Sequence, residues 1–123
     1  MKVLYTFELK KDKFYCYANE NLSSSEIDAI EHGDFAETMK NCSKIIFVIH
    51  EIYDCNWFTA ACLYKYDRVN NTLLHTRLYN EEAWTFKWFI TDDENCIIKY
   101  ADGQEDGSWS YFNVNKWEYL DEE

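Results

Sequence analysis

Carboxylates are the side chains of this chain best placed to do chemistry with a partner. The 123 residues include 23 acidic and 12 basic ones, which gives a formal net charge of −11. The excess is uneven: residues 14–43 carry −5 and residues 81–123 carry −9, whereas residues 1–13 carry +2. Packing alone does not call for such self-repulsion, but a surface that meets a positively charged partner does.

Many of these carboxylates fall in predicted turns. In an antiparallel meander successive turns alternate between the two ends of the sheet. The turns at 53–56, 80–83 and 102–108 should therefore share one end. We call the residues expected there the acidic rim, with two tryptophans near the strand ends as candidate anchors: Asp54, Glu81, Glu82, Asp102, Glu105, Asp106, Trp84 and Trp109. The alternative is a merely solvated rim, because acidic residues also suit turns and solubility.

A second acidic surface is expected on the helical stretch, residues 24–41. Its outward-facing residues are Glu26, Asp28, Glu31 and Glu37. Either this surface, the acidic rim or an aromatic sheet face could bind a partner.

No catalytic residue or cofactor site is predicted. His50 and Glu51 are adjacent, and neighbours in a strand point to opposite faces, so they cannot form an acid–base couple. The sequence has no serine elbow, glycine-rich phosphate loop or H-E-x-x-H motif. Paired carboxylates for glycoside hydrolysis stay open, but their abundance makes them uninformative.

No metal site is predicted either. The five cysteines include no C-x-x-C pair, so we expect reduced thiols that pack as small apolar groups. The run from Asp102 to Gly107 resembles the first half of a calcium loop. The twelfth position is Asn113 in place of the bidentate glutamate, so we expect a hairpin loop there.

The elements that must position these residues are mostly strands. Ser23 with Glu26, and Asp34 with Glu37 after Gly33, have the spacing of helix N-terminal capping boxes. They predict two short helices, or one helix bent at Gly33, over 24–32 and 35–41. Alternating apolar residues and polar turns predict strands at 2–9, 13–18, 44–52, 57–66, 72–79, 84–91, 96–101, 109–114 and 117–120.

We therefore predict an α+β fold, a predominantly antiparallel meander of about 7–9 strands, in a single domain over residues 1–123. The helices should pack on one face of the sheet. Several strands, such as 57–66, are apolar on both faces, and the sequence does not say what covers the second face.

The sequence features favour a cytoplasmic protein without a membrane span, since no secretion signal or apolar run of about 20 residues is present. Direct nucleic-acid binding is disfavoured by the charge. The leading hypothesis is a small acidic protein that inhibits a basic, nucleic-acid-processing protein: an immunity protein to a nuclease toxin, a phage-encoded anti-defence inhibitor or a nucleic-acid mimic. The alternatives are an aromatic-face module for a carbohydrate-type ligand and a non-catalytic homodimeric structural subunit.

Overall fold

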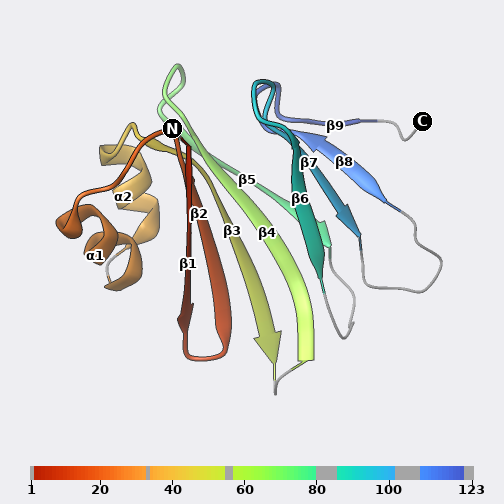
Figure 1. Ribbon diagram of the computed structural model, residues 1–123, viewed down its shortest axis with the longest axis horizontal. Coiled ribbons are helices and arrows are strands. Elements are labelled where there is room, and N and C mark those ends of the chain that lie inside the picture. The colour runs from red at the N-terminus through yellow and green to blue at the C-terminus, as the bar shows by residue number, and fades with distance from the viewer. Residues whose placement is uncertain (1, 33, 55–56, 80–85, 102–108, 121–123) are drawn as a thin grey trace.

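The protein is an α+β fold, as predicted, and all pairings between the described strands are antiparallel (Figure 1). The computed structural model describes residues 2–32, 34–54, 57–79, 86–101 and 109–120. The elements are β1 Val3–Leu9, β2 Asp12–Ala18, α1 Ser24–His32, α2 Phe35–Asn41, β3 Ile45–Asp54, β4 Trp57–Asp67, β5 Thr72–Tyr79, β6 Lys87–Asp92, β7 Ile97–Ala101, β8 Ser110–Asn113 and β9 Glu118–Leu120.

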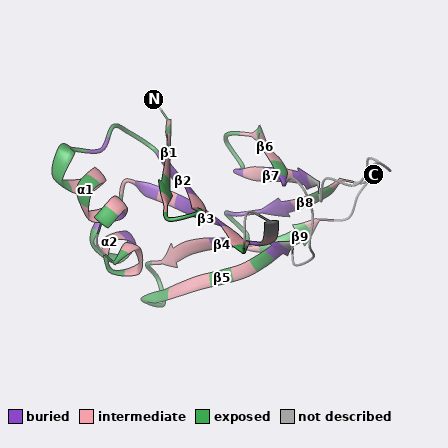
Figure 2. Cartoon of the chain, turned by 90° about the horizontal axis from the view of Figure 1, so that it is seen from below, coloured by how far each residue is buried: buried purple, intermediate pink, exposed green. Residues whose placement is uncertain are grey.

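The strands divide into two sheets. The hydrogen-bonded order β1-β2-β3-β4-β5 ends at β5, and a second sheet has the order β6-β7-β8-β9. The two sheets face each other, with buried parts of β3, β7 and β8 between them (Figure 2). The second sheet therefore covers the apolar face of the first that the sequence left without a cover.

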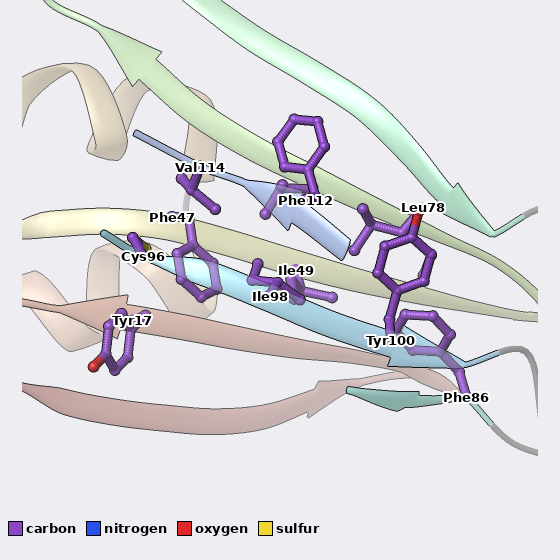
Figure 3. Close-up of a cluster of buried hydrophobic side chains, with 12 residues drawn as sticks. Tyr17, Phe47, Ile49, Leu78, Phe86, Cys96, Ile98, Tyr100, Phe112 and Val114 are labelled. Carbon is purple, nitrogen blue, oxygen red and sulfur yellow. The ribbon is translucent and has the colours of Figure 1, made fainter. Parts of the chain in front are cut away.

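The core between the sheets is built from both of them (Figure 3). Phe47, Ile49 and Leu63 come from the first sheet, while Ile98 and Phe112 come from the second, and all are almost fully buried. Along β3 Phe47 and Ile49 alternate with Val48, which faces the opposite side of the sheet and is also buried, as the pleat of a strand requires.

The helices cover the opposite face of the five-stranded sheet. Ile30 from α1 and Met39 from α2 are buried against a second cluster that includes Phe14 and Val48. The predicted helix bounds are confirmed, because the predicted caps form. The Ser23 hydroxyl accepts a hydrogen bond from the Glu26 amide, and the Ser23 amide donates to the Glu26 carboxylate at 2.7 Å.

Asp34 caps the second helix. Its carboxylate accepts hydrogen bonds from the amides of Ala36 and Glu37, at 3.0 and 3.4 Å. A carboxylate at a helix N-terminus also interacts favourably with the helix dipole.

Polar contacts join the two sheets along both sides of the sandwich. On one side, Lys2 and the Tyr17 hydroxyl both donate to Asp93 in the β6–β7 turn. On the other, the Tyr119 hydroxyl of β9 donates to the carbonyl of Arg77 in β5 at 2.8 Å and lies 2.6 Å from the Thr76 hydroxyl. The free edge of β5 is therefore partly occupied by a side chain of the other sheet.

Neither described helix has the length and apolar character needed to cross a membrane.

Candidate acidic binding surfaces

Three strands end where the turns predicted to form the acidic rim begin. β3 ends at Asp54, β5 at Tyr79 and β7 at Ala101, and the three strands run in the same direction (Figure 1). Asp54 is exposed and forms no ion pair with another described residue. The predicted rim residues that lie outside the described residues are Glu81, Glu82, Trp84, Asp102, Glu105 and Asp106.

Trp109 belongs to an exposed aromatic surface on the outer face of the second sheet. Its ring centroid lies 5.8 Å from that of Phe89, which is 54% exposed. The Lys99 ammonium lies 4.6 Å from the Trp109 ring and 5.9 Å from the Tyr111 ring. We call Phe89, Lys99, Trp109 and Tyr111 the aromatic patch. The sequence analysis did not predict Lys99 and Tyr111 as neighbours of Trp109.

Glu26 of the predicted helical surface is engaged within the protein. Its carboxylate accepts a hydrogen bond from Lys44 at 2.9 Å, in addition to the Ser23 amide, and lies 3.2 Å from the Cys42 sulfur. The hydrogen bond from Lys44 is the largest of the causes that lower the pKa of Glu26 to about 2. Glu26 therefore stabilises the junction between α1 and the start of β3.

The other three members of the helical surface are more available. Asp28 and Glu31 each lie 3.9 Å from the His32 imidazole. Glu37 is exposed and accepts a hydrogen bond from the Asn41 side chain at 3.3 Å. Asp28, Glu31 and Glu37 form the part of the predicted helical surface that can meet a partner without breaking an internal lysine pair. A cavity of about 220 Å³ lies between the helices, lined in part by Glu26, Glu37 and Cys42.

Most described carboxylates have no basic partner. Fifteen of the 23 acidic residues lie in the described part of the chain. Only two of them, Glu20 and Glu26, form an ion pair with lysine or arginine there, and both pair with Lys44. The negative charge of the described surface is thus largely uncompensated by neighbouring cations.

The rim end of the sandwich also carries a basic corner that the sequence analysis missed. The β1–β2 turn lies at the same end of the first sheet as the C-terminal end of β3 (Figure 1). Lys10, Lys11 and Lys13 lie in or beside this turn. Turn alternation applied to the first hairpin as well would have placed them there.

His50 and Glu51 point to opposite faces of β3, as predicted. The His50 ring stacks on Phe14 with centroids 4.2 Å apart, and its Nε2 lies 2.9 Å from the Asp12 carboxylate. Glu51 is only 2% exposed and accepts a hydrogen bond from the Tyr53 hydroxyl. Burial raises the pKa of Glu51, while the Tyr53 hydrogen bond, Lys13 and Tyr15 oppose that rise.

The described cysteines are free thiols. Burial raises the pKa of Cys16 to about 12 and that of Cys96 to about 11, so neither is a reactive thiolate at neutral pH. Within the described ranges, no cluster of three or more histidine, cysteine or acidic residues could hold a metal ion. The Asn113 carboxamide oxygen accepts a hydrogen bond from the Lys116 amide at 2.9 Å.

The chain matches no protein-family model, no curated protein and no solved structure, so the chemistry of these surfaces is the basis on which its function can be argued.

Proposed function

We propose that this chain is a non-catalytic inhibitor that binds the positively charged groove of a nucleic-acid-processing protein. The observation that carries the proposal is the uncompensated charge: of fifteen described carboxylates, only Glu20 and Glu26 pair with a lysine. An immunity protein to a nuclease toxin and a phage-encoded anti-defence inhibitor both act in this way.

The chemistry of the partner follows from the charge. Proteins that bind nucleic acids use lysine and arginine to neutralise phosphates. A folded surface with closely spaced carboxylates offers such a groove the same negative charge as the phosphates of a nucleic acid. Complementary charge also speeds encounter, with association rate constants up to about 10⁸–10⁹ M⁻¹s⁻¹ at low salt.

Capture from the native host tests the proposal. The immobilised chain is incubated with host lysate at low salt, and bound proteins are identified and then eluted with increasing salt. The expected result is a basic nuclease or nucleic-acid-binding protein that elutes as ionic strength rises, and whose activity the free chain inhibits at a one-to-one ratio. If the captured proteins retain full activity with excess chain present, the inhibitor function is wrong.

The aromatic patch favours a second candidate function, a module for a small planar or carbohydrate-type ligand. Phe89 and Trp109 lie with their ring centroids 5.8 Å apart on an outer sheet surface, where a sugar ring can pack against aromatic side chains. Such binding should change little between low and high salt, whereas binding to a basic groove should weaken markedly. Titration with oligosaccharides at two ionic strengths therefore separates the two candidates.

The alternative of a homodimeric structural subunit depended on an apolar sheet face that a second copy of the chain could cover. The second sheet of the same chain covers that face, so this face no longer supports the alternative. Homodimerisation itself stays a prediction, and a light-scattering mass tests it.

A further inference from the structure

We infer that the cavity beside the β1–β2 turn is a binding site for a phosphate dianion, either free or as the terminal phosphate of a small molecule. The cavity has a volume of about 340 Å³ and is lined by Glu8, Lys10, Lys11, Lys13 and Tyr53. Three lysines against one glutamate make its lining net positive in a chain whose net charge is −11. The inference is independent of the proposed inhibitor function.

These lysines differ from others in the described part of the chain, which hold the fold together. Lys44 pairs with Glu26, and Lys65 donates to the carbonyls of Val114 and Asn115. Arg68 donates to two carbonyls at the end of α2. By contrast, the side-chain ammonium groups of Lys10, Lys11 and Lys13 form no ion pair or hydrogen bond with any described residue. Lys10 and Lys11 are exposed to a ligand, and Lys13 lies between the Tyr53 ring and the Glu51 carboxylate.

Asp12, the first residue of β2, does not form an ion pair with these lysines, because both of its carboxylate oxygens already have hydrogen-bond partners. One oxygen of Asp12 lies 2.9 Å from His50 Nε2, and the other accepts a hydrogen bond from the Tyr53 amide at 3.0 Å. In β2 Asp12 and Lys13 are consecutive and so point to opposite faces of the sheet. Asp12 thus anchors the hairpin to β3 on one face of the sheet, and Lys13 lies on the other.

Tyr53 and Lys13 give the cavity a defined wall. The Lys13 ammonium lies 5.5 Å from the centre of the Tyr53 ring, and the Tyr53 hydroxyl is held by Glu51. Strand register places Lys13 opposite Glu8 on one side and Glu51 on the other. The side chains of cross-strand partners share a face of the sheet, so Lys13 lies between an exposed and a buried carboxylate.

The kind of cation indicates the kind of anion. Lysine ammonium groups act as compact point charges with several donors, whereas planar bidentate recognition of carboxylates is the work of arginine. No arginine lines this cavity. Three lysines that line one cavity suit a tetrahedral oxyanion with two negative charges, and the volume of about 340 Å³ leaves room for a small group attached to it.

Titration of the full chain with sodium phosphate, followed by NMR, tests the site. Sodium chloride at matched ionic strength is the reference, and glycerol phosphate and dimethyl phosphate are the other arms. We expect saturable shifts of the Lys10–Lys13 and Tyr53 resonances with phosphate and glycerol phosphate, and much weaker ones with the singly charged diester. A dissociation constant lower for glycerol phosphate than for phosphate assigns the site to a phosphorylated small molecule, and the reverse order assigns it to free phosphate.

Two variants with the same change in charge show whether the cavity is responsible. Lys11→Gln with Lys13→Gln should weaken phosphate binding by about tenfold or more, since each removes a charge-assisted contact. Lys40→Gln with Lys116→Gln, both exposed elsewhere, should leave it unchanged. Absence of saturation in the native chain, or equal loss in both variants, would overturn the site. Neither result bears on inhibition of a basic partner, which is measured separately.

Discussion

The Tyr53 hydroxyl donates a hydrogen bond to the carboxylate of Glu51, 2.9 Å away and two residues earlier in β3. Glu51 is almost completely buried, yet it lies beside the cavity that the three lysines line. A buried carboxylate is costly unless hydrogen bonds and nearby cations support it. Tyr53 and Lys13 supply this support here. The same two residues line the cavity, so they connect it to the buried Glu51.

Replacing Glu51 should show how much this support matters. Glu51→Ala removes the carboxylate that accepts the Tyr53 hydrogen bond and opens a small cavity at a buried site, so we expect a loss of about 2–4 kcal/mol in the free energy of unfolding. Glu51→Gln keeps an oxygen acceptor and should cost clearly less. Urea unfolding at neutral pH measures both, and equal losses would show that the hydrogen bond is unimportant.

The raised pKa of Glu51 predicts a pH dependence of stability. A raised pKa means that Glu51 holds its proton more tightly in the folded state than in the unfolded state. Its contribution to the free energy of unfolding is therefore fully present below the unfolded pKa of about 4.3 and is lost as pH rises through the folded pKa. The free energy of unfolding of the native chain, relative to Glu51→Gln, should therefore fall as pH rises across that window. A difference that rises with pH would contradict the assignment.

Glu26 should behave in the opposite way. Its pKa is lowered to about 2 by Lys44 and the helix cap, so its stabilising contribution is present above the unfolded pKa and is lost as pH falls towards 2. Glu26→Gln should lower stability at neutral pH and flatten the acid unfolding curve between about pH 5 and 2. Asp28→Gln, at an exposed site beside it on the same helix, is the control and should leave the shape of that curve nearly unchanged.

The helical acidic surface can be tested by charge reversal without touching a cap. Asp28→Lys with Glu31→Lys should leave the thermal midpoint nearly unchanged, because the only described ion-pair partner of either carboxylate is His32, at 3.9 Å. If this surface steers the partner, the association rate at low salt should fall about tenfold. Glu94→Lys with Glu118→Lys changes the net charge equally at exposed sites in the second sheet. An equal fall in that control would assign the effect to net charge alone.

The acidic rim has its own test. Changing Glu81, Glu82, Asp102, Glu105 and Asp106 to lysine should preserve folding, since these are predicted turn positions, and should abolish partner binding. Circular dichroism checks the first expectation and a pull-down with the captured partner checks the second. Retained binding would show that the helical surface or the aromatic patch makes the contact.

Local signals in the sequence predicted the elements well, because each depends on near neighbours. The Ser23–Glu26 and Asp34 caps determine where α1 and α2 begin, and both form as expected. The division into two sheets was not predictable in this way. A connection of a few residues between β5 and β6 can join neighbours in one sheet or partners across a sandwich, and packing of residues such as Phe47 against Ile98 decides between them.

The candidate sites were predictable only in part. Alternation of the turns predicts that 53–56, 80–83 and 102–108 share one end, which stays a prediction because most of these residues lie outside the described ranges. The same alternation was not applied to the first hairpin, where Lys10, Lys11 and Lys13 lie. Ion pairing could not be read from the sequence either. Glu26 and Glu37 both occupy the third position of a helix, yet only Glu26 meets a lysine, because Lys44 follows α2 and returns past α1.

The contact of Tyr119 with β5 has a consequence for the behaviour of the protein at high concentration. The outer edge of a sheet offers unpaired amides and carbonyls on which strands of other molecules can assemble. The Tyr119 hydroxyl occupies the Arg77 carbonyl on that edge and keeps β9 across it. A chain that lost β9 would free that carbonyl of β5, Thr72–Tyr79, for pairing with a strand of another molecule. We therefore expect loss of the last strand to increase aggregation at high concentration.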